Sequence, residues 1–520
     1  MVPVLIASVT FVVWTAWLVS RYQADKGRPP LPPGPPGDPV IGHLRILHPH
    51  YHWKTYVQWG KTYGERNVMY TNMFGWPQII LNSIVDAKEL LEKRGANYSD
   101  RPRMMLLREV MGLRGLTFLP YRDRFRQNRR LIQQFFNPRA SAQFRPAQKL
   151  QVMILLNHLL QAPEDFLRHI QRWASRTMLN VAYGHQVVDD DDPYAAVVER
   201  TNMLVSNSGN PGATLVDFIP ILRFFPAWFP GARYMRHASE IKILNRRMVD
   251  ETFELAKRNK AKGFGKQSLS SKYLDILEQH GECHGALEDD MKEMVASIYP
   301  AGVATQRASV TSFVLAMVHF PEVAARARKE LDLVVGRDRL PDWSHRKSLP
   351  FLEWVLKENF RWNPVTALGI PHRAMEEDVY QGRRIPQGAT VIANIWAMTH
   401  DESAFPDPFI FKPERYAEGD GKNAAFDPTD AVFGFGRRQC PGRFFADAGL
   451  WLAMACILAN FDISPCLDDD GNAVLPSIEF SPVFTSNPLP FQCRITSRDE
   501  ISAALVRRGI QDMVEGGFES

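Results

Sequence analysis

Cysteine is scarce in this chain and shows no pairing pattern. Five cysteines occur among 520 residues, and none has the C-x-x-C spacing of a zinc site or the density of a disulfide-stabilised secreted scaffold. We therefore expect free thiols in a reducing compartment at Cys283, Cys456, Cys466 and Cys493. The fifth, Cys440, lies among glycines, and this setting makes it a candidate for a chemical role.

An excess of charge of one sign is also missing. Lys and Arg number 62 and Asp and Glu number 57, so the formal net charge is only +5. This balance gives no global electrostatic case for binding DNA or RNA, and we predict no nucleic-acid partner. No internal repeat is visible, and no linker interrupts residues 40–495. A chain of this length can hold about three domains, but its pattern favours one large domain.

Charge is absent from residues 1–20, which are mostly apolar. As a helix they would be about 30 Å long, which matches the hydrocarbon core of a bilayer. Arg21, Lys26 and Arg28 follow, and basic flanks stay in the cytosol. A cleaved signal peptide is the alternative, but it normally has a basic start and a shorter apolar stretch. The sequence thus predicts a single-pass transmembrane anchor, with the rest of the chain facing the cytosol.

Proline is concentrated directly after this segment, in residues 29–39. Prolines at this density make a stiff, extended chain that cannot enter a helix or a sheet ladder. We interpret residues 21–39 as a basic, proline-rich hinge that fixes the following domain against the membrane. The alternative is a proline-rich ligand for a small adaptor domain.

Helical patterns dominate the rest of the chain. Two long stretches, residues 146–182 and 288–336, have apolar residues at three- and four-residue spacing, which is typical of helices packed on a core. Short strand-like runs occur at residues 67–70, 78–81 and 390–393. The predicted fold class is therefore mainly α (α+β), a large helical domain with a small β region. Residues 498–520 form an amphipathic C-terminal tail.

The run around Cys440 has the features of a loop that holds a thiolate against a metal. Glycines let the backbone turn tightly and bring N–H groups toward the sulfur, and such donors favour the thiolate. The spacing F-x-x-G-x-R-x-C-x-G, carried by Phe433, Gly436, Arg438, Cys440 and Gly442, resembles the haem-binding loop of the cytochrome P-450 family. The alternative is a buried structural cysteine near a glycine-rich turn.

This resemblance implies haem b as the cofactor, with Cys440 as the axial iron ligand. It also implies that Arg438 meets a haem propionate and that Phe433 shields the sulfur. A thiolate ligand pushes electron density onto the iron and favours cleavage of the O–O bond.

Residues 297–306 resemble the oxygen-activating stretch of the family's long central helix. The resemblance implies that Gly302 leaves room where dioxygen and substrate approach the iron, and that the Thr305 hydroxyl assists proton delivery. The position before that threonine is usually Asp or Glu, but here it is Ala304. Acid–base assistance is typically worth about 10²–10⁴-fold in rate. Either Gln306 or a substrate hydroxyl orders the proton-delivering water instead, or the enzyme is slow, uncoupled or active without O–O cleavage. A glycine-containing core helix is the alternative interpretation.

Two further arginines match positions that contact haem propionates in the family. Arg129 follows Phe125 by four residues, and Phe125 stands where the family has a tryptophan. Arg373 matches the contact to the other propionate, and we interpret His372 as a polar neighbour rather than an iron ligand. A separate set, Glu358, Arg361 and Arg415, resembles the family's buried ionic network, which implies a folding role.

Two surface features suggest contacts with larger partners. Arginines at positions 122, 124, 126, 437 and 443 could form a basic patch that steers an acidic electron donor. An aromatic group comprises Phe218, Phe224, Phe225, Trp228 and Phe229. These rings either belong to the core or lie where the family has a loop that dips into the bilayer surface.

The resemblance extends from the proline-rich hinge to about Arg494, and details around residues 94–102 are most similar to the fungal secondary-metabolism branch. It implies the cytochrome P-450 fold for a haem-thiolate catalytic domain at residues 40–497. The implied enzyme is a monooxygenase of the endoplasmic reticulum membrane that inserts one oxygen atom into an apolar small molecule. Its electrons would come from NADPH through a flavin-containing NADPH–cytochrome P-450 reductase, with cytochrome b5 as an additional donor.

Two alternatives stay open at this point. One is a haem-thiolate isomerase, lyase or dehydratase that uses the same fold without dioxygen. The other is a non-catalytic haem-binding protein that senses or sequesters a ligand. Dependence of turnover on NADPH and dioxygen separates the first alternative from a monooxygenase, and absence of any turnover despite haem loading would favour the second.

Overall fold

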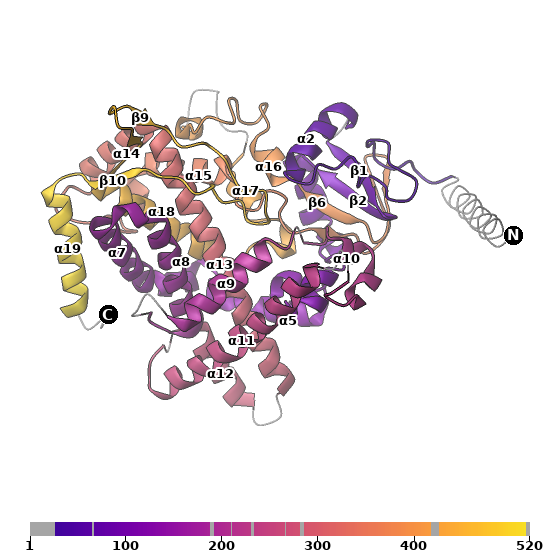
Figure 1. Ribbon diagram of the computed structural model, residues 1–520, viewed down its shortest axis with the longest axis horizontal. Helices are drawn as coiled ribbons and strands as arrows, with labels where there is room; N and C mark the ends of the chain where they lie inside the picture. Colours follow the sequence, from indigo (N-terminus) through magenta and orange to yellow (C-terminus); the bar gives the residue numbers. More distant parts are fainter. Residues whose placement is uncertain are drawn as a thin grey trace.

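The computed structural model describes residues 27–64, 67–187, 192–209, 211–229, 233–265, 267–280, 285–417 and 426–515. The predicted anchor at residues 1–20, residues 21–26 of the predicted hinge, and Cys283 lie outside the described residues. Helices fill most of the molecule, and a small sheet lies at the end nearer the start of the chain (Figure 1). The predicted mainly α fold with a small β region is thus confirmed.

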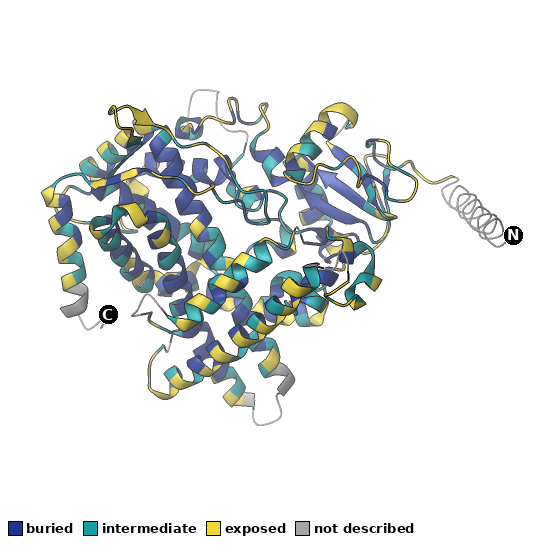
Figure 2. Cartoon of the chain, in the orientation of Figure 1, coloured by how far each residue is buried: buried dark blue, intermediate teal, exposed yellow. Residues whose placement is uncertain are grey.

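The helical part is built around α13, the long helix Gly285–His319. It packs on α8 (Phe166–Tyr183), α18 (Arg443–Asn460) and α15 (Pro350–Trp362). One apolar core joins these helices, and Figure 2 shows it as the dark blue interior. Around it lie α5 (Asp123–Phe136), α6 (Pro138–Ser141), α7 (Arg145–Gln161), α9 (Pro193–Ser206), α10 (Leu215–Phe218), α11 (Arg233–Ala261), α12 (Leu269–His280), α14 (Pro321–Val334) and α17 (Thr429–Val432).

Each of the two long helical stretches predicted from the sequence contains two helices. Residues 146–182 lie in α7 and α8, and residues 288–336 lie in α13 and α14, which are bent by 105° relative to each other. The bend falls at Phe320, because Pro321 disfavours the helical conformation of the residue before it. Pro300, in contrast, lies inside α13 without ending it. The helix α13 therefore continues through Pro300 and Gly302.

The small sheet has four strands in the order β1-β2-β6-β3. These are β1 (Val68–Met73), β2 (Trp76–Leu81), β6 (Thr390–Ala393) and β3 (His372–Arg373). β1 and β2 form an antiparallel hairpin, and β2 pairs in parallel with β6. The three predicted strand runs are thus confirmed. Short helices α2 (His52–Tyr63), α3 (Ile84–Ala87), α4 (Gly95–Tyr98) and α16 (Ile395–Thr399) also occur, together with paired strands β4 (Asp378–Tyr380) and β5 (Arg383–Ile385), β7 (Phe461–Ser464) and β10 (Arg494–Ser497), and β8 (Cys466–Leu467) and β9 (Ala473–Val474).

The proline-rich segment lies against the sheet region. The Pro30 carbonyl accepts the Arg384 N–H at 2.8 Å, and the Pro33 carbonyl accepts the Tyr70 N–H at 2.9 Å. Proline donates no backbone N–H, but its carbonyl remains a good acceptor. The described part of the predicted hinge is therefore fixed to the domain by its carbonyl groups from Pro30 onward.

A buried ionic network holds the segment after α16 against α15. Arg361 donates to the Glu358 carboxylate from Nε at 2.8 Å and from Nη2 at 2.7 Å. Nε of Arg415 donates to the same carboxylate at 3.1 Å. Both guanidinium groups also donate to backbone carbonyls within residues 399–410. Removing one member would leave a buried charge uncompensated, at a cost of about 3–5 kcal/mol. This geometry supports the folding role predicted for the three residues.

One helix among the described residues is apolar and long enough to cross a membrane. It is α18, with a mean hydropathy of 1.2, and 67% of it is buried inside the fold. Because α18 packs against α7, α13 and α14, we interpret it as a core helix. Helices α13 and α14 are long and apolar enough to cross a membrane only if the two are counted together as one bent span.

The predicted C-terminal tail contains a helix that is docked on the domain. This is α19 (Glu500–Glu515), which lies against α7 at the end of the molecule opposite the sheet (Figure 1). Val506 is fully buried, and a Cβ on Gly509 would lie 2.3 Å from Met153 Cε on α7. An ion pair between Arg498 and Asp332, 2.6 Å long, holds the start of the segment. The helix therefore covers an apolar face of α7.

Removing the buried side chain of α19 should lower stability. Val506→Ala deletes two methyl groups from a fully buried position, and we expect a loss of about 2 kcal/mol. The matched control is Ile501→Ala on the same helix, because Ile501 is 60% exposed. Thermal unfolding followed by circular dichroism should show a lower midpoint for Val506→Ala only. Equal midpoints for the two variants would contradict the docking of α19.

Candidate functional site

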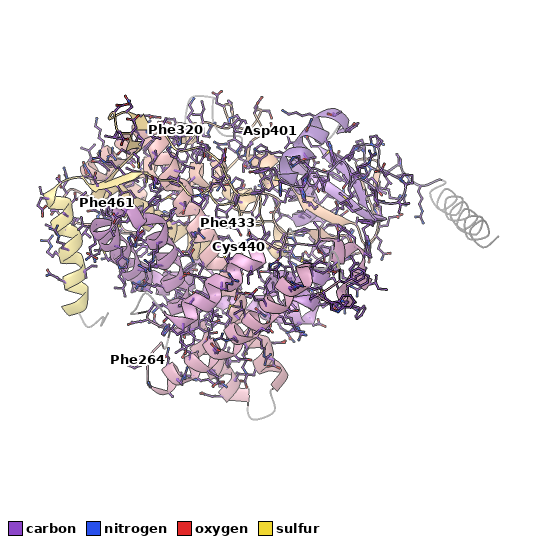
Figure 3. All side chains as sticks on the ribbon, viewed as in Figure 1. Phe264, Phe320, Asp401, Phe433, Cys440 and Phe461 are labelled. Carbon is purple, nitrogen blue, oxygen red and sulfur yellow. The ribbon has the colours of Figure 1, made fainter. Side chains whose placement is uncertain are left out.

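Glycine shapes the loop around Cys440. Gly434 and Gly436 have φ angles of 73° and 53°, a conformation that residues with side chains rarely adopt. A Cβ on Gly436 would lie 2.3 Å from the carbonyl oxygen of Leu91, so a larger residue would clash there. The Cys440 N–H donates to the Phe433 carbonyl at 2.7 Å and closes the loop. The loop thus brings Phe433 and Cys440 together near the centre of the molecule (Figure 3).

Opposing effects act on the Cys440 thiol. Burial raises its pKa, because a thiolate loses hydration in the interior. A hydrogen bond from the Gly442 N–H and the charges of Arg129 and Arg443 lower the pKa and favour the thiolate. Cys440 also precedes α18, and the N-terminus of a helix favours negative charge. A metal cation facing the sulfur would lower the pKa of Cys440 further and so favour the thiolate.

Phe433 contributes an aromatic ring on the side of the loop toward α15. It packs edge-on against Phe360, with 5.3 Å between the ring centroids. The ring is half-buried. Its contact with α15 fixes the start of the loop, and the shielding of the Cys440 sulfur by Phe433 stays a prediction.

Arg438 enters the interior two residues before Cys440. Its Nε and Nη2 donate to the carbonyls of Ser99 and Leu119 at 2.7 and 2.8 Å. Its guanidinium carbon lies 3.7 Å from the centroid of the Phe125 ring, so the residue that replaces the family's tryptophan stacks on this arginine. Nη1 of Arg438 is buried and has no partner among the described residues. Burial lowers the pKa of Arg438 to about 9, which indicates a guanidinium that lacks a compensating anion.

Arg101 and His372 are buried next to Arg438. Nη1 of Arg101 donates to the carbonyls of residues 370 and 371 at 2.7 and 2.9 Å. Nδ1 of His372 donates to the Tyr98 carbonyl at 2.7 Å. Burial lowers the pKa of Arg101 and of His372 well below their usual values, and the charge of Arg438 acts in the same direction. These three side chains, Arg101, His372 and Arg438, are called the basic cluster below.

Arg373 is not part of the basic cluster, which corrects the sequence-based expectation. Successive residues of a strand point to opposite faces, and on β3 His372 is buried whereas the Arg373 side chain is 45% exposed. Arg373 instead pairs with the Asp100 carboxylate at 3.3 Å. Arg101 and His372 therefore replace Arg373 as the candidates for holding an anionic group at this end of the site.

Arg129 lies one turn after Phe125 on α5, on the same face of the helix. Its side chain is half-buried, and burial lowers its pKa while the nearby Cys440 sulfur acts in the opposite direction. Arg129 thus lies within electrostatic reach of Cys440. Its predicted contact with a propionate stays a prediction.

The middle of α13 supplies the residues predicted for oxygen activation. The Thr305 hydroxyl donates to the Ala301 carbonyl at 2.8 Å. The missing side chain of Gly302 faces α8, because a Cβ there would lie 2.5 Å from Met178 Sδ. Gly302 therefore permits close packing of two helices, contrary to the expectation that it opens space for dioxygen. Ala301, one turn before Thr305, is exposed in the middle of α13 and borders accessible space instead.

Gln306 points away from the side of α13 that carries Thr305. Consecutive helical residues are rotated by about 100°, and the Gln306 side chain is 2% exposed. Its Nε2 donates to the Gly302 carbonyl at 3.1 Å, and its Oε1 lies 3.8 Å from the Cβ position of Gly449 on α18. The structure thus separates Gln306 from Thr305, and this placement does not support the predicted role of Gln306 in ordering water beside that hydroxyl.

The residues around Cys440 fit a haem. The basic cluster holds buried positive charge, and the free Nη1 of Arg438 can donate to a carboxylate. Gly434 and Gly442 leave open space, because a Cβ on either would have no neighbour within 4 Å. A thiol beside that space suits an iron ligand. Cys440 would hold the iron, and Arg101, His372 and Arg438 would hold carboxylates of the same group.

The arginines predicted to form a basic patch differ in their surroundings. Arg124 is paired with Asp290 at the start of α13, so its charge is neutralised there, contrary to the expectation. Arg126 pairs with Asp123 at 2.7 Å. Arg122 and Arg437 are exposed, and Arg437 donates to the Tyr121 hydroxyl at 2.8 Å. Arg443 is half-exposed and donates to the Cys440 carbonyl at 3.3 Å. The remaining basic surface is therefore smaller than the sequence suggested.

Sequence reasoning missed Arg101 and Ala301 as site residues. A lone arginine in a loop gives no signal of burial, and only the folded chain shows that Arg101 reaches two carbonyls far along the sequence. The two-residue period of a strand could have shown that His372 and Arg373 face opposite sides. The helical period places both Ala301 and Gly302 beside Thr305, and only the packing of Met178 against Gly302 distinguishes the two.

The fold and this site define a haem-thiolate protein. A model of the family described as cytochrome P-450 matches residues 32–494. The chain is 38% identical to cytochrome P-450 monooxygenase 176 of Postia placenta over 498 residues, which is 95% of both chains. It is 36% identical to a cytochrome P-450 monooxygenase of Armillaria gallica, covering 96% of this chain and 99% of that one. The chain belongs to the cytochrome P-450 family, as an oxidoreductase similar to fungal monooxygenases.

A solved structure supports the fold separately. A zebra fish cytochrome P-450 determined with abiraterone superimposes with a TM-score of 0.68 at 23% sequence identity, covering 86% of this chain and 100% of that chain. At this identity the likeness concerns the fold alone. It confirms the cytochrome P-450 fold that the Cys440 loop implied.

Replacing the predicted iron ligand should change the spectrum of the haem protein. Cys440→Ser removes the sulfur and should abolish the red-shifted carbonyl band of a thiolate-bound ferrous haem. The matched control is Cys456→Ser, since Cys456 is buried on α18 with its sulfur 3.7 Å from the Pro341 carbonyl. The measurement is a reduced, carbon-monoxide difference spectrum. Loss of the band in Cys456→Ser but not in Cys440→Ser would show that the ligand assignment is wrong.

Haem retention should distinguish the two arginines near β3. Arg101→Gln removes a buried charge from the basic cluster, so haem transfer to excess apomyoglobin should become about tenfold faster, as expected for loss of one charged hydrogen bond. Arg373→Gln changes a side chain that is 45% exposed and should leave the rate unchanged. Because Arg101 also binds backbone carbonyls, the thermal midpoint of each apoprotein is measured alongside. Faster loss from Arg373→Gln than from Arg101→Gln would restore the original prediction.

Proposed function

We propose that this protein is a membrane-anchored haem-thiolate monooxygenase that inserts one oxygen atom from dioxygen into an apolar organic molecule. The observation that carries the proposal is the position of the Cys440 thiol in a glycine-shaped loop, two residues after the buried Arg438, whose Nη1 has no partner among the described residues. When bound, haem supplies the activation of dioxygen and the transfer of the oxygen atom. The chain's own residues hold that group, exclude water and bring protons.

Proton delivery is the step where this chain departs most from its family. The Thr305 hydroxyl is engaged with the Ala301 carbonyl at 2.8 Å, and Ala304 has no titratable group. Gln306 faces α18 rather than the Thr305 side of α13. We therefore propose that Thr305 orders a water molecule and that this water, or a hydroxyl group of the substrate, delivers the proton. This arrangement also favours the second candidate function, an isomerase, lyase or dehydratase that needs no such proton.

The exposed aromatic loop supports membrane contact. Phe224, Trp228 and Phe229 are 71%, 75% and 42% exposed, so the alternative that this group belongs to the core does not hold for these three. The loop reaches the sheet, where the Trp76 indole donates to the Phe218 carbonyl at 3.2 Å. Exposed Trp and Phe side chains suit the interface of a bilayer. Together with the predicted anchor at residues 1–20, they support attachment to the endoplasmic reticulum membrane with the domain in the cytosol.

The positive charge on the surface near the Cys440 loop is the basis for the proposed electron donor. Arg122 and Arg437 expose positive charge near the Cys440 loop, and Arg443 adds to it. Such a surface would steer an acidic flavoprotein that carries electrons from NADPH, with cytochrome b5 as an additional donor. The substrate is proposed to be a small apolar molecule, and the similarity to fungal monooxygenases supports a secondary metabolite.

Coupling of NADPH use to product should test the proposed proton route. Ala304→Asp places a carboxylate one residue before Thr305 and should raise the fraction of NADPH that yields product rather than peroxide. Thr305→Ala should lower that fraction, because the hydroxyl no longer orders water. The measurement compares NADPH, peroxide and product in the reconstituted system.

The control for this experiment is Ser309→Ala, one turn farther along α13 than Thr305 and 4% exposed, which should leave coupling unchanged. Unchanged coupling in both Ala304→Asp and Thr305→Ala would exclude this stretch from proton delivery. Product that forms without dioxygen would instead establish the isomerase or lyase function.

A further inference from the structure

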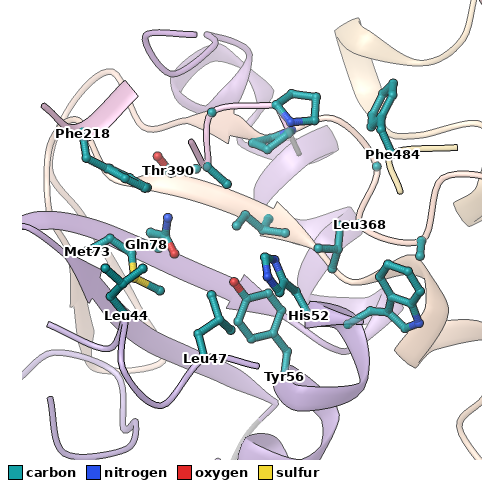
Figure 4. Close-up of a pocket in the computed structure, with 18 of the residues that line it drawn as sticks. Leu44, Leu47, His52, Tyr56, Met73, Gln78, Phe218, Leu368, Thr390 and Phe484 are labelled. Carbon is teal, nitrogen blue, oxygen red and sulfur yellow. The ribbon is translucent and has the colours of Figure 1, made fainter. Parts of the chain in front are cut away.

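Buried glutamine side chains occur in both parts of the molecule. Gln78 lies in the sheet, beside a pocket of about 50 Å³ (Figure 4), where its Oε1 accepts a hydrogen bond from the neighbouring strand β1 at 3.2 Å. Gln148 on α7 and Gln306 on α13 lie in the helical part, and each is 2% exposed. Both lie beside α18, the helix that follows Cys440, and Gln306 comes directly after Thr305. The two helical glutamines therefore adjoin both elements of the candidate site.

The Gly302 carbonyl accepts two hydrogen bonds from the same residue. Because α13 is helical throughout Gly285–His319, the Gln306 backbone N–H donates to this carbonyl as part of the helix. Nε2 of Gln306 donates to it as well, at 3.1 Å. A carbonyl oxygen has two lone pairs. The Gly302 carbonyl therefore has no acceptor capacity left for a third donor.

The Thr305 hydroxyl has a choice of acceptors that this occupancy decides. In a helix, a threonine hydroxyl can donate to the carbonyl three or four residues back, which for Thr305 means Gly302 or Ala301. The hydroxyl donates to the Ala301 carbonyl at 2.8 Å. Since Gln306 already occupies the Gly302 carbonyl, only the Ala301 carbonyl is open to it. The direction of the Thr305 hydroxyl thus depends on the residue that follows it.

Packing keeps the Gln306 amide in this orientation. Its Oε1 is buried and has no hydrogen-bond partner among the described residues. A flipped amide would bring this oxygen against the Gly302 carbonyl, so that two acceptors would face each other. On the far side, Oε1 lies 3.8 Å from the Cβ position of Gly449 on α18. The amide nitrogen therefore faces Gly302, and the amide oxygen faces α18.

Gln148 fills the space on the other side of Gly449. A Cβ on Gly449 would lie 2.7 Å from Nε2 of Gln148, so a larger residue there would displace that amide. The same Nε2 donates at 2.8 Å to the Phe445 carbonyl, which lies in the first turn of α18. Both amides border Gly449, and the turn of α13 that carries Thr305 is thereby packed against the helix that begins after the Cys440 loop.

We propose that Gln306 is a positioning residue, which fixes the direction of the Thr305 hydroxyl by occupying the Gly302 carbonyl. It acts through Thr305 and touches no reacting atom. This conformational role follows from the hydrogen bonds of α13, whereas its consequence for proton delivery rests on the proposed monooxygenase function.

Crystal structures of the haem-loaded protein test the conformational role directly. Gln306→Met keeps the length of the side chain and removes its amide, so one lone pair of the Gly302 carbonyl becomes free. The Thr305 hydroxyl should then divide between the carbonyls of Gly302 and Ala301, with about half of the molecules in each orientation. Gln306→Leu provides the same test if Gln306→Met does not load haem. A hydroxyl that stays wholly on Ala301 in the variant would overturn the proposal.

The matched control is Gln151→Met, the same substitution at a buried position of α7. Gln151 is 5% exposed, its Oε1 has no partner among the described residues, and no hydrogen bond joins it to the described part of α13. This variant should leave the Thr305 hydroxyl on Ala301. An equal shift of the hydroxyl in Gln151→Met and Gln306→Met would show that any loss of a buried amide moves it, and would reject the specific role of Gln306.

Turnover tests the consequence through a double variant. Gln306→Met should lower the fraction of NADPH that yields product about twofold, in proportion to the molecules whose Thr305 hydroxyl has turned. In the Thr305→Ala background the same change should have no further effect, because Gln306 acts only through that hydroxyl. An equal fall in both backgrounds would indicate a general loss of structure and would reject the positioning role.

The two measurements separate this role from the proposed function. A turned Thr305 hydroxyl in Gln306→Met, together with product that forms without dioxygen, would retain the positioning role and reject the monooxygenase function. Dioxygen-dependent product with an unchanged hydroxyl in Gln306→Met would retain the function and reject the positioning role.

Discussion

Buried positive charge that the protein itself does not neutralise is the constraint on which the site depends. Arg438 reaches the interior two residues before Cys440, and its Nη1 has no partner among the described residues. Arg101 lies beside it, and the charge of Asp100, which also pairs with Arg373, compensates these two arginines only in part. Burying a charge is costly unless a partner compensates it. An anionic group bound here would compensate that charge, and a cofactor with carboxylates and a metal for Cys440 fits this arrangement.

The same buried guanidinium groups join parts of the chain that are far apart in sequence. Arg438 binds the carbonyls of Ser99 and Leu119, and Arg101 binds those of residues 370 and 371. Behind them, Glu358 is held by two arginines and fixes the segment that precedes the loop. Binding of the cofactor should thus stabilise the contact between the helical part and the sheet, as any ligand that binds only the native state does.

The sequence predicted the elements well where a local pattern determines them. The strand at residues 390–393 has the predicted bounds, because it is a short, mostly apolar run that is buried throughout. Cys440 was identifiable because it and four positions around it must together meet one chemical requirement. The sequence could not show whether Arg101 or Arg373 is buried at the site, since the burial of each depends on segments that are distant in the sequence. The prediction for Gly302 was wrong for a related reason. Only the packing of α8 against α13 shows that Met178 occupies the space beside Gly302.

Charge is distributed unevenly between the two sides of the haem site. The side of Cys440 carries Arg129, Arg438 and Arg443, whereas the stretch of α13 from Ala301 to Gln306 carries no ionisable side chain. In the first arrangement, Arg129 and Arg443 act to lower the Cys440 pKa, against the raising effect of burial. The second leaves protons to water or to the substrate.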